Sequence, residues 1–562
     1  MKMKKILTTA LTVSLVGISL AACNSKGSDE GSSSPSASSP SSSASASSAA
    51  PEQSKEFRFA LVEPPTLDPS LLKDAQSIIV DYGLFEGLTR LSADGEPQPA
   101  VAEKWDISED GKTYTFHLRK DMKWSNGDPV TAHDFEFAWK RTLAKDTASD
   151  YAYFLFYLEN GEEYNAGNAT ADQVGVKALD DYTLEAKLTK ATPYFISLVA
   201  HNSYYPENQK VVEAKPDWAS EADTIVTNGP FLLKKWEHNS NIVMEKNPNY
   251  YDKDKVHFTK VSVSLLEEDS TIYNLYQTDK IDWIGAQAGS IPSDHIPQML
   301  KDGTAKVEPI AGTYYYEFNT TKKPFSNIKI RKAFSMAINR QAIIDNVTKG
   351  HQQPAFALVP PKIAGVDGKK FRELYPDNGF FTENVDEAKK LLAEGLQEEG
   401  LSKMPEFTLL YNTNEGHKAI AEAIADMWRK NLGVQVKVTN QEWGTFLNTR
   451  SAQQYDVARA GWGADFNHAI NFTYDLIHSK SGNNDGKYSN AQVDKLLDDS
   501  LNAASEKDRL DKIAQAEKIA MADEMAELPI YYYTAVTTLK PGFTGVQSDY
   551  AGNLYWVFGD KQ

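Results

Sequence analysis

The sequence predicts two α/β lobes, because strand-like and helix-like stretches alternate along a chain too long for one hydrophobic core. Residues 114–119 and 434–438 alternate apolar and polar side chains as half-buried strands do. The body of the chain, from about residue 56 to residue 562, exceeds the size of a usual single domain. No internal repeat is visible, so the lobes are expected to differ.

Helix ends can be placed from local signals. Thr131 and Asp134 have the spacing of a capping box and follow a turn at 126–129, which predicts a helix from about residue 132. Apolar residues at helical spacing predict a second helix over about 417–431, with Gly433 as its stop.

A third helical stretch is expected over about 491–526. Its apolar spacing is interrupted near Ser505, so we expect a break there. Pro529 is expected to end the helix before an apolar strand at 530–533.

The N-terminus has the pattern of a secretory signal over residues 1–22. Three lysines among the first five residues precede an apolar run at 6–20, and small residues follow it. Threonines and serines interrupt this run, whereas a bilayer span needs ~20 mostly apolar residues. We therefore expect export rather than a permanent membrane helix.

Cys23 is the only cysteine of the chain and directly follows Leu20-Ala21-Ala22. This arrangement resembles the bacterial lipoprotein pattern, which implies a diacylglyceryl thioether and an N-palmitoyl group on Cys23 after cleavage. Stable anchoring requires more than one acyl chain, and such a lipid provides it. The alternative is an ordinary signal followed by an incidental thiol without a disulfide partner.

A tether is predicted over residues 23–55. It consists almost wholly of Ser, Ala, Pro and Gly and cannot bury enough apolar surface to fold. As a flexible coil its ~32 residues span roughly 30 Å. That length would hold the body clear of a membrane surface.

Charge and motifs exclude several function classes. The net charge is −18 and the pI about 5.1, which argues against a nucleic-acid partner. The chain lacks a G-x-S-x-G elbow, a Walker A loop and an H-E-x-x-H motif. No two of the ten histidines have the spacing of a helical metal pair. We therefore predict a protein that is not an enzyme and binds neither metal nor cofactor.

The stretch 455–467 is the most informative about a binding site. A short strand is expected to carry Arg459 into a loop that contains Gly461, Trp462, Gly463 and Asp465. Glycines permit the close approach of another backbone, and an indole offers a flat apolar wall. A carboxylate beside such a wall would prefer a cationic partner.

A structural alternative exists for this stretch. Asp465 or Asn467 could simply cap the N-terminus of the following helix, as Asp and Asn often do. Spacing alone does not decide between the two interpretations.

The stretch resembles the ligand-binding loop of the oligopeptide-binding proteins, the receptors of Opp-type transporters among the family-5 solute-binding proteins. The resemblance covers essentially the whole body. The segments that carry it are 65–69, 84–88, 124–135, 228–231, 441–443 and 456–462.

The resemblance implies roles for individual residues. Asp465 would bind the ligand's α-amino group, and Gly461 and Gly463 would pair through their backbones with an extended peptide. Trp443 and Trp462 would form walls of side-chain pockets.

Basic groups at graded distances would bind the ligand's carboxylate. Arg459 and His417 match two of them, and Arg450 matches another basic residue of the cavity. Thr348 stands at the position of the family's carboxylate-binding lysine, with Lys349 one residue on, so the ligand contact of Lys349 is left open.

Other positions depart from the family pattern. Gly463 replaces a cysteine found in some members. Lys73 and Asp74 replace an acidic residue and a glycine.

The resemblance also implies a fold and its domains. It is a two-lobed fold of the type II periplasmic-binding-protein kind with a subdomain inserted in the first lobe. Lobe 1 would comprise 56–90, 225–316 and 530–562, the inserted subdomain 91–224, and lobe 2 317–529.

Three functions remain open at this point. The first is a monomeric, lipid-anchored receptor that delivers short peptides to the permease and ATPase subunits of an Opp-type ABC importer. It would lie on the outer face of the cytoplasmic membrane of a Gram-positive cell. The second is the same scaffold with another ligand, such as a nickel chelate, haem, a sugar or a signalling peptide. The third is a secreted peptidase.

Overall fold

The computed structural model describes residues 55–562. The predicted signal at 1–22, Cys23 and all but the last residue of the predicted tether lie outside the described residues. Strands and helices alternate through the rest, which confirms the α/β class.

The first sheet has the order β1-β10-β9-β8. β1 and β10 pair in parallel, although about 200 residues separate them in the sequence. Most of the chain between them lies outside this sheet. Phe57 and Phe59 on the first strand are fully buried beneath the sheet's covering elements. The strands are β1 Glu56–Leu61, β8 Phe231–Glu237, β9 Asn241–Lys246 and β10 Lys260–Leu265, and the helix beside them is α1 Ala75–Leu84.

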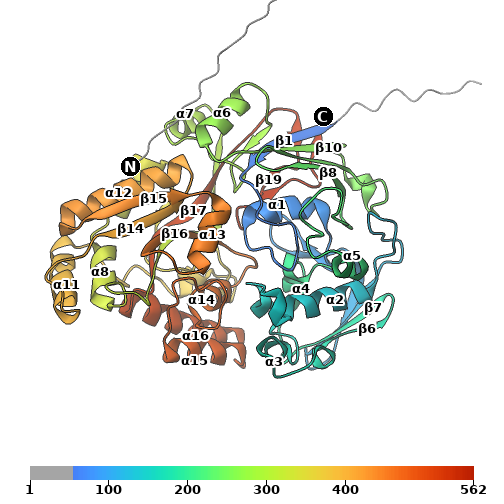
Figure 1. Cartoon of the computed structure of the whole chain (residues 1–562), viewed down its shortest axis with the longest axis horizontal. Coiled ribbons are helices and arrows are strands. Elements are labelled where there is room, and N and C mark those ends of the chain that lie inside the picture. Colours follow the sequence, from blue (N-terminus) through green and yellow to red (C-terminus); the bar gives the residue numbers. More distant parts are fainter. Residues whose placement is uncertain (1–54) are drawn as a thin grey trace, which may run out of the picture. The chain divides into compact units, whose positions relative to one another are not determined.

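The intervening segment forms its own antiparallel sheet of order β4-β5-β7-β6, covered by a helix (Figure 1). That helix begins with the predicted capping box of Thr131 and Asp134, which confirms the prediction. The predicted strand at 114–119 is also confirmed, one residue earlier. These elements are β4 Ala102–Ile107, β5 Thr113–Leu118, α2 Ala132–Leu143, β6 Val176–Asp180 and β7 Thr183–Lys187.

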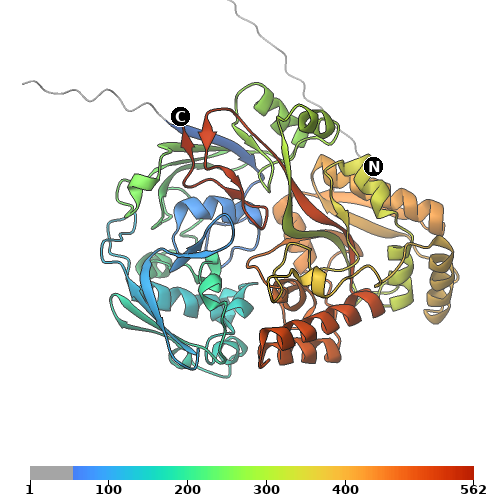
Figure 2. The same ribbon diagram turned by 180° about the vertical axis from the view of Figure 1, so that it is seen from behind.

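The largest sheet has the order β11-β17-β12-β16-β14-β15, with β13 beside β17. Two of its strands are 13 residues long and run side by side between the two halves of the body (Figure 2). The strands are β11 Trp283–Ile284, β12 Lys306–Phe318, β13 Gln353–Pro354, β14 Phe407–Asn412, β15 Val436–Gln441, β16 Val457–Gly463 and β17 Glu527–Leu539.

The expectation that Pro529 precedes the strand was wrong. β17 starts at Glu527 and contains the proline, which lies next to a shift in register between Tyr314 and Tyr315 of β12. An irregularity of this kind tolerates a residue without an N–H donor. The predicted lobe boundaries at 316/317 and 529/530 thus fall inside continuous strands, and the domain limits stay a prediction.

Helices surround β14 and β15 (Figure 1). The second predicted helix is confirmed over Glu415–Leu432, and Gly433 ends it in a left-handed conformation with φ 71°. The break near Ser505 is confirmed as well, since the Ser505 side chain caps a new helix. The helices around β14 and β15 are α8 Ile328–Met336, α11 Val385–Glu398, α12 Glu415–Leu432 and α13 Trp443–Ser451. Helices α14 Ile470–Ile477, α15 Ala491–Leu501 and α16 Glu506–Lys518 pack against one another in a separate group, below these strands in Figure 1.

Two further expectations need correction. The strand expected at 434–438 runs two to three residues later, because buried Val434 belongs to the turn before it. Gly461 and Gly463 lie within β16 and not in a loop after it.

Shorter helices include α3 Gly161–Ala166, α4 Phe195–Leu198, α5 Gln209–Ala214, α6 Asp269–Gln277, α7 Ile296–Lys301, α9 Arg340–Ile343 and α10 Phe371–Leu374.

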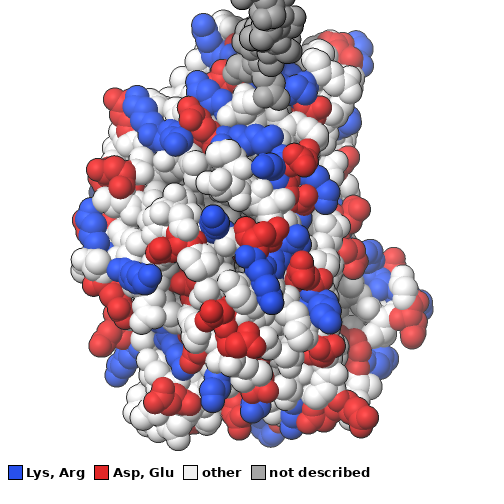
Figure 3. All heavy atoms as spheres, turned by 90° about the vertical axis from the view of Figure 1, so that its right-hand side faces the viewer, with Lys and Arg blue, Asp and Glu red and all other residues white. Residues whose placement is uncertain are grey.

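The surface carries both signs of charge. Lys and Arg side chains are interspersed with Asp and Glu over the face shown in Figure 3. None of the helices within residues 55–562 is both long enough and apolar enough to cross a bilayer.

Candidate functional site

A cavity of about 580 Å³ lies among β16, the N-terminal ends of α1 and α12, and the C-terminal segment. This volume is typical of a ligand-binding site. The cavity collects residues that are distant in sequence. Among the predicted site residues it is lined by His417, Trp443, Arg450, Arg459, Gly461, Trp462, Gly463 and Asp465.

One face of β16 forms the floor of this cavity. Arg459, Gly461 and Gly463 alternate along the strand, and Asp465 follows two residues beyond its end. Alternate residues of an extended chain point to the same side. The floor therefore has a cation at one end, a carboxylate at the other and no side chains between, over ~20 Å at ~3.3 Å per residue.

The backbone of β16 has a free edge at this floor. Its pairing with β12 continues along the whole strand to Gly463. Its pairing with β14 on the opposite side ends at Ala458. Within the described residues, 459–463 therefore lack a strand partner on that side, which is the geometry that strand addition requires.

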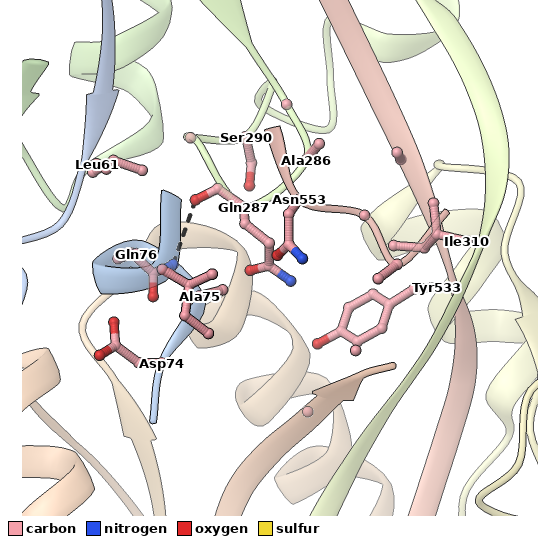
Figure 4. Close-up of a pocket in the computed structure, with 18 of the residues that line it drawn as sticks. Leu61, Asp74, Ala75, Gln76, Ala286, Gln287, Ser290, Ile310, Tyr533 and Asn553 are labelled. Carbon is pink, nitrogen blue, oxygen red and sulfur yellow. Dashed lines mark hydrogen bonds between the residues drawn. The ribbon is translucent and has the colours of Figure 1, made fainter. Parts of the chain in front are cut away.

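Gly461 leaves room that any side chain would fill. A Cβ atom there would lie 2.3 Å from the hydroxyl oxygen of Tyr533 and 3.2 Å from a guanidinium nitrogen of Arg459. Figure 4 shows the Tyr533 ring directed into the cavity. The glycine thus permits both polar groups to approach the strand.

Asp465 does not cap the following helix. That helix, α14, begins at Ile470, and its N-cap residue Ala469 makes no side-chain bond. The Asn467 side chain instead accepts a hydrogen bond from the backbone of Ala364. The helix-cap alternative is therefore wrong for both residues.

The Asp465 carboxylate has two uncharged hydrogen-bond donors and one histidine as neighbours. Its side chain is 11% exposed, and one oxygen lies 3.5 Å from Nε2 of His201. The other oxygen accepts hydrogen bonds from Nδ2 of Asn471 at 3.0 Å and from the hydroxyl of Tyr151 at 3.5 Å. Within the described residues, no Lys or Arg nitrogen lies within 4 Å of it. Within residues 55–562, a cation arriving in the cavity would therefore find a carboxylate that no Lys or Arg already pairs.

Arg459 is the complementary group at the other end. Its guanidinium donates to the hydroxyl of Tyr533 at 2.8 Å and to Oδ1 of Asn412 at 3.4 Å, and lies over the ring of Tyr314. No carboxylate of the described part of the chain lies within 4 Å of it. This half-buried cation is free to bind an anion.

His417 lies beside Arg459 at the N-terminal end of α12. Burial, and then the charge of Arg459, lower its pKa well below the usual value. Its ring is therefore neutral and pairs with the hydroxyl of Tyr314 at 3.3 Å. The helix N-terminus also favours an anion here.

Arg450 is already paired. Its guanidinium binds both oxygens of Glu317, at 2.7 and 3.0 Å, and lies 3.2 Å from Asp485. Burial raises the pKa of Glu317 to about 7, an effect that the guanidinium partly offsets. Arg450 thus touches the cavity with its charge balanced, and its contact with a ligand stays a prediction.

The two predicted wall residues are half-buried and are fixed by their indole N–H groups. Trp462 donates to Oδ1 of Asn471 at 3.4 Å, and Trp443 donates to Oδ1 of Asp74 at 3.3 Å. Trp443 also stacks on Phe446. Both rings therefore have a defined orientation at the cavity.

Lys349 does not line the cavity, whereas its neighbour Thr348 does. Its ammonium group pairs with Asp294 at 2.5 Å instead. A ligand contact for Lys349 gains no support from this arrangement.

Several residues that line the cavity carry no signal in the sequence that marks them as site residues. Tyr151, His201 and Tyr533 have no motif that connects them with Asp465 or Arg459. Lys73 differs from the family pattern, and its ammonium group binds Asp150 at 2.5 Å and Ser451 at 2.9 Å. It therefore joins three segments that are distant in sequence.

A further contact between distant segments is visible in Figure 4, where the side chain of Gln76 donates a hydrogen bond to the backbone carbonyl of Gln287.

Metal ligands are not clustered. Residues 55–562 contain no group of three or more His, Cys, Asp or Glu side chains that could hold an ion.

Asp269 gives the cavity wall a pH-dependent contact. The side chain is 4% exposed and accepts hydrogen bonds from Nδ2 of Asn414 at 2.9 Å and from the backbone of Ser290 at 3.1 Å. Burial raises its pKa to about 7. The folded protein therefore binds a proton here that the unfolded chain releases near pH 4.

We expect Asp269→Asn to remove this dependence. The wild-type contribution is fully present below pH 4 and is lost as the pH rises through 7. The free energy of unfolding of the variant, relative to wild type, should therefore increase by at most about 4 kcal/mol between pH 4 and pH 8. Urea unfolding at several pH values measures this difference, and parallel profiles of the two proteins would contradict it.

Comparison with known proteins decides the family. The model of the bacterial extracellular solute-binding proteins, family 5 (middle), matches residues 96–484, well over half of the chain. The chain belongs to this family. The predicted resemblance is thereby confirmed.

Individual members are similar over nearly their full length. This family-5 protein is 42% identical to the oligopeptide-binding protein OppA of Bacillus subtilis, over 88% of this chain and 90% of that one. Haemophilus influenzae OppA in complex with the peptide RPPGFSPFR superimposes with a TM-score of 0.85 at 35% identity, over 91% and 99% of the two chains. The two-lobed type II fold is thereby confirmed.

Two structures of one relative bear on the conformation. The murein tripeptide-binding protein MppA of Escherichia coli matches with a TM-score of 0.83 at 32% identity, over 91% of this chain and 99% of that one. The form of MppA described as unliganded and open matches with a TM-score of only 0.60 at 33% identity, over 91% of this chain and 98% of that one. The lobes of this family-5 protein are therefore arranged unlike those of the open form.

Proposed function

We propose that this family-5 protein is the peptide receptor of an ATP-driven importer and binds short peptides in an extended conformation between its lobes. One observation carries the proposal. Within residues 55–562, a free strand edge joins a carboxylate without a Lys or Arg partner to a guanidinium without a carboxylate partner. A peptide in its zwitterionic form has the matching charges and the matching backbone.

The pairing scheme follows from this arrangement. The peptide's ammonium group binds Asp465, its backbone pairs with 459–463 of β16, and its carboxylate binds Arg459 beside the N-terminus of α12. Backbone pairing gives affinity without reading the side chains. The ~20 Å of backbone between residues 459 and 465 corresponds to about six residues of extended chain.

The relatives support the ligand class. Those already compared are named oligopeptide-binding or murein tripeptide-binding proteins, and one is a complex with a nine-residue peptide. They are binding proteins and not enzymes, so we expect no turnover of a bound peptide.

Native mass spectrometry tests the function directly. The purified protein is incubated with an equimolar pool of peptides of two to ten residues, and the mass of the complex and of the released ligands is measured. We expect short peptides to bind and to be released intact. Cleaved peptides, or a complex with a different small molecule that excludes peptides, would contradict the proposal.

The membrane attachment is part of the same proposal. Cys23 carries the lipid, residues 24–55 form the tether, and the anchored receptor hands peptides to the permease and ATPase subunits at the outer face of the cytoplasmic membrane of a Gram-positive cell. The lone cysteine after a signal-like segment supports this.

We expect Cys23→Ser to abolish anchoring. Without a thiol the acyl chains have no attachment point, so more than about nine-tenths of the protein should move from the membrane fraction to the medium, because stable anchoring takes more than one acyl chain. Cell fractionation and immunoblotting measure the distribution, with Ser25→Ala as the matched control. Retention of the Cys23→Ser protein in the membrane would refute the lipid anchor.

A further inference from the structure

Asn471 lies in α14, directly behind the predicted amine-binding carboxylate, and is fully buried. Its Oδ1 accepts hydrogen bonds from the backbone N–H of Asp465 at 2.7 Å and from the indole of Trp462 at 3.4 Å. Its Nδ2 donates to Oδ2 of Asp465 at 3.0 Å and to Oδ2 of Asp475. One side chain thus contacts the backbone, the carboxylate and the indole wall of the site.

These contacts fix the orientation of the amide. Both groups that face Oδ1 can only donate, so the oxygen must point at them. The nitrogen then faces the two carboxyl groups, and both of its hydrogens are used. A flipped amide would place N–H groups against N–H groups. The four bonds exhaust the hydrogen-bonding capacity of an asparagine side chain.

The amide holds the carboxylate without neutralising it. A Lys or Arg at this place would cancel the charge that a ligand cation needs, whereas the Asn471 amide has no charge. Behind it, burial and then the charge of Asp465 raise the pKa of Asp475 well above its usual value.

We propose that Asn471 is a positioning residue that sets where the Asp465 carboxylate meets the ammonium group of the ligand. This inference rests on the proposed function, because it concerns the amine end of a bound peptide. Asn471 acts through Asp465 and makes no contact with the peptide itself. Its effect should therefore be limited to ligands that have a free amine.

The test compares Asn471→Asp with wild type by isothermal titration of one pentapeptide in free and N-acetylated form. The substitution keeps the shape of the side chain but replaces the donating amide nitrogen with a carboxyl oxygen, which faces the carboxyl groups of Asp465 and Asp475. We expect the affinity for the free peptide to fall at least tenfold and that for the acetylated peptide to change less than about twofold. Asn467→Asp, the same substitution at an exposed residue that bonds the backbone of Ala364 and does not line the cavity, should bind both peptides as wild type does.

The outcomes are separable. An Asn471→Asp protein that binds the free peptide normally, or loses both peptides equally, overturns the positioning role. If this variant does not fold, Asn471→Ser is measured against the same criterion. A wild-type protein without preference for the free amine refutes the proposed function itself, which the wild-type titrations reveal before any variant is considered.

Discussion

Asp465→Asn should lower the affinity for a free short peptide by about two to four orders of magnitude. In the wild type the carboxylate is almost buried, and no Lys or Arg of the described residues lies within 4 Å of it. The substitution leaves the ligand's ammonium group desolvated and without a counter-charge. Breaking one partner of such a buried ion pair costs about 3–5 kcal/mol, and each 1.4 kcal/mol is tenfold in affinity.

Isothermal titration of the free and the N-acetylated peptide isolates this effect. Acetylation removes the cation from the ligand side, so wild type should bind the acetylated peptide about as weakly as Asp465→Asn binds the free one. Asp294→Asn is the matched control, because that carboxylate also lines the cavity but is exposed and paired with Lys349. Equal affinity of wild type for both peptides would exclude Asp465 as the amine-binding group.

Arg459→Gln is expected to produce the second large loss, of about two orders of magnitude or more, for peptides whose carboxylate reaches it. Among the described residues, the guanidinium is bound by two neutral groups, Tyr533 and Asn412, and lies over the ring of Tyr314. Glutamine retains hydrogen bonding but removes the charge. The carboxylate of the ligand would then be buried without a counter-ion.

A length series of peptides with free and amidated C-termini measures this contribution. The loss should appear for free carboxylates, depend on peptide length and be absent for the amides, because an amide has no charge to satisfy. Lys349→Gln serves as control, since this cation lies outside the cavity lining and is paired with Asp294. A loss that is equal for free and amidated peptides at every length would contradict the assignment of Arg459.

Parts of the fold were predictable because their signals are local. The capping box at Thr131 needs only residues three positions apart, and the stop at Gly433 needs only a residue that tolerates positive φ. The β16 stretch was predictable as a site through its resemblance to a family, because spacing alone left a helix cap open and placed both glycines in a loop. In the structure Arg459, Gly461 and Gly463 share one face of β16, and Asp465 follows two residues beyond its end.

Other features depend on partners far away in the chain. The local sequence predicts that Pro529 ends a helix, but Pro529 lies inside β17, next to a register shift in β12 that tolerates a residue without an N–H donor. Arg450 is paired with Glu317, 133 residues away, so it reaches the cavity with its charge balanced. No local pattern contains this information.

The sequence by itself therefore determined the α/β class, the family resemblance and the order of charges along β16, since each depends on neighbouring residues. Only the tertiary structure decided which of those charges remain without a partner. Within the described residues, Asp465 accepts hydrogen bonds from the uncharged side chains of Tyr151 and Asn471 and has no Lys or Arg nitrogen within 4 Å. The free energy of a buried charge depends on every group within a few ångströms, and folding brings most of those groups from distant segments.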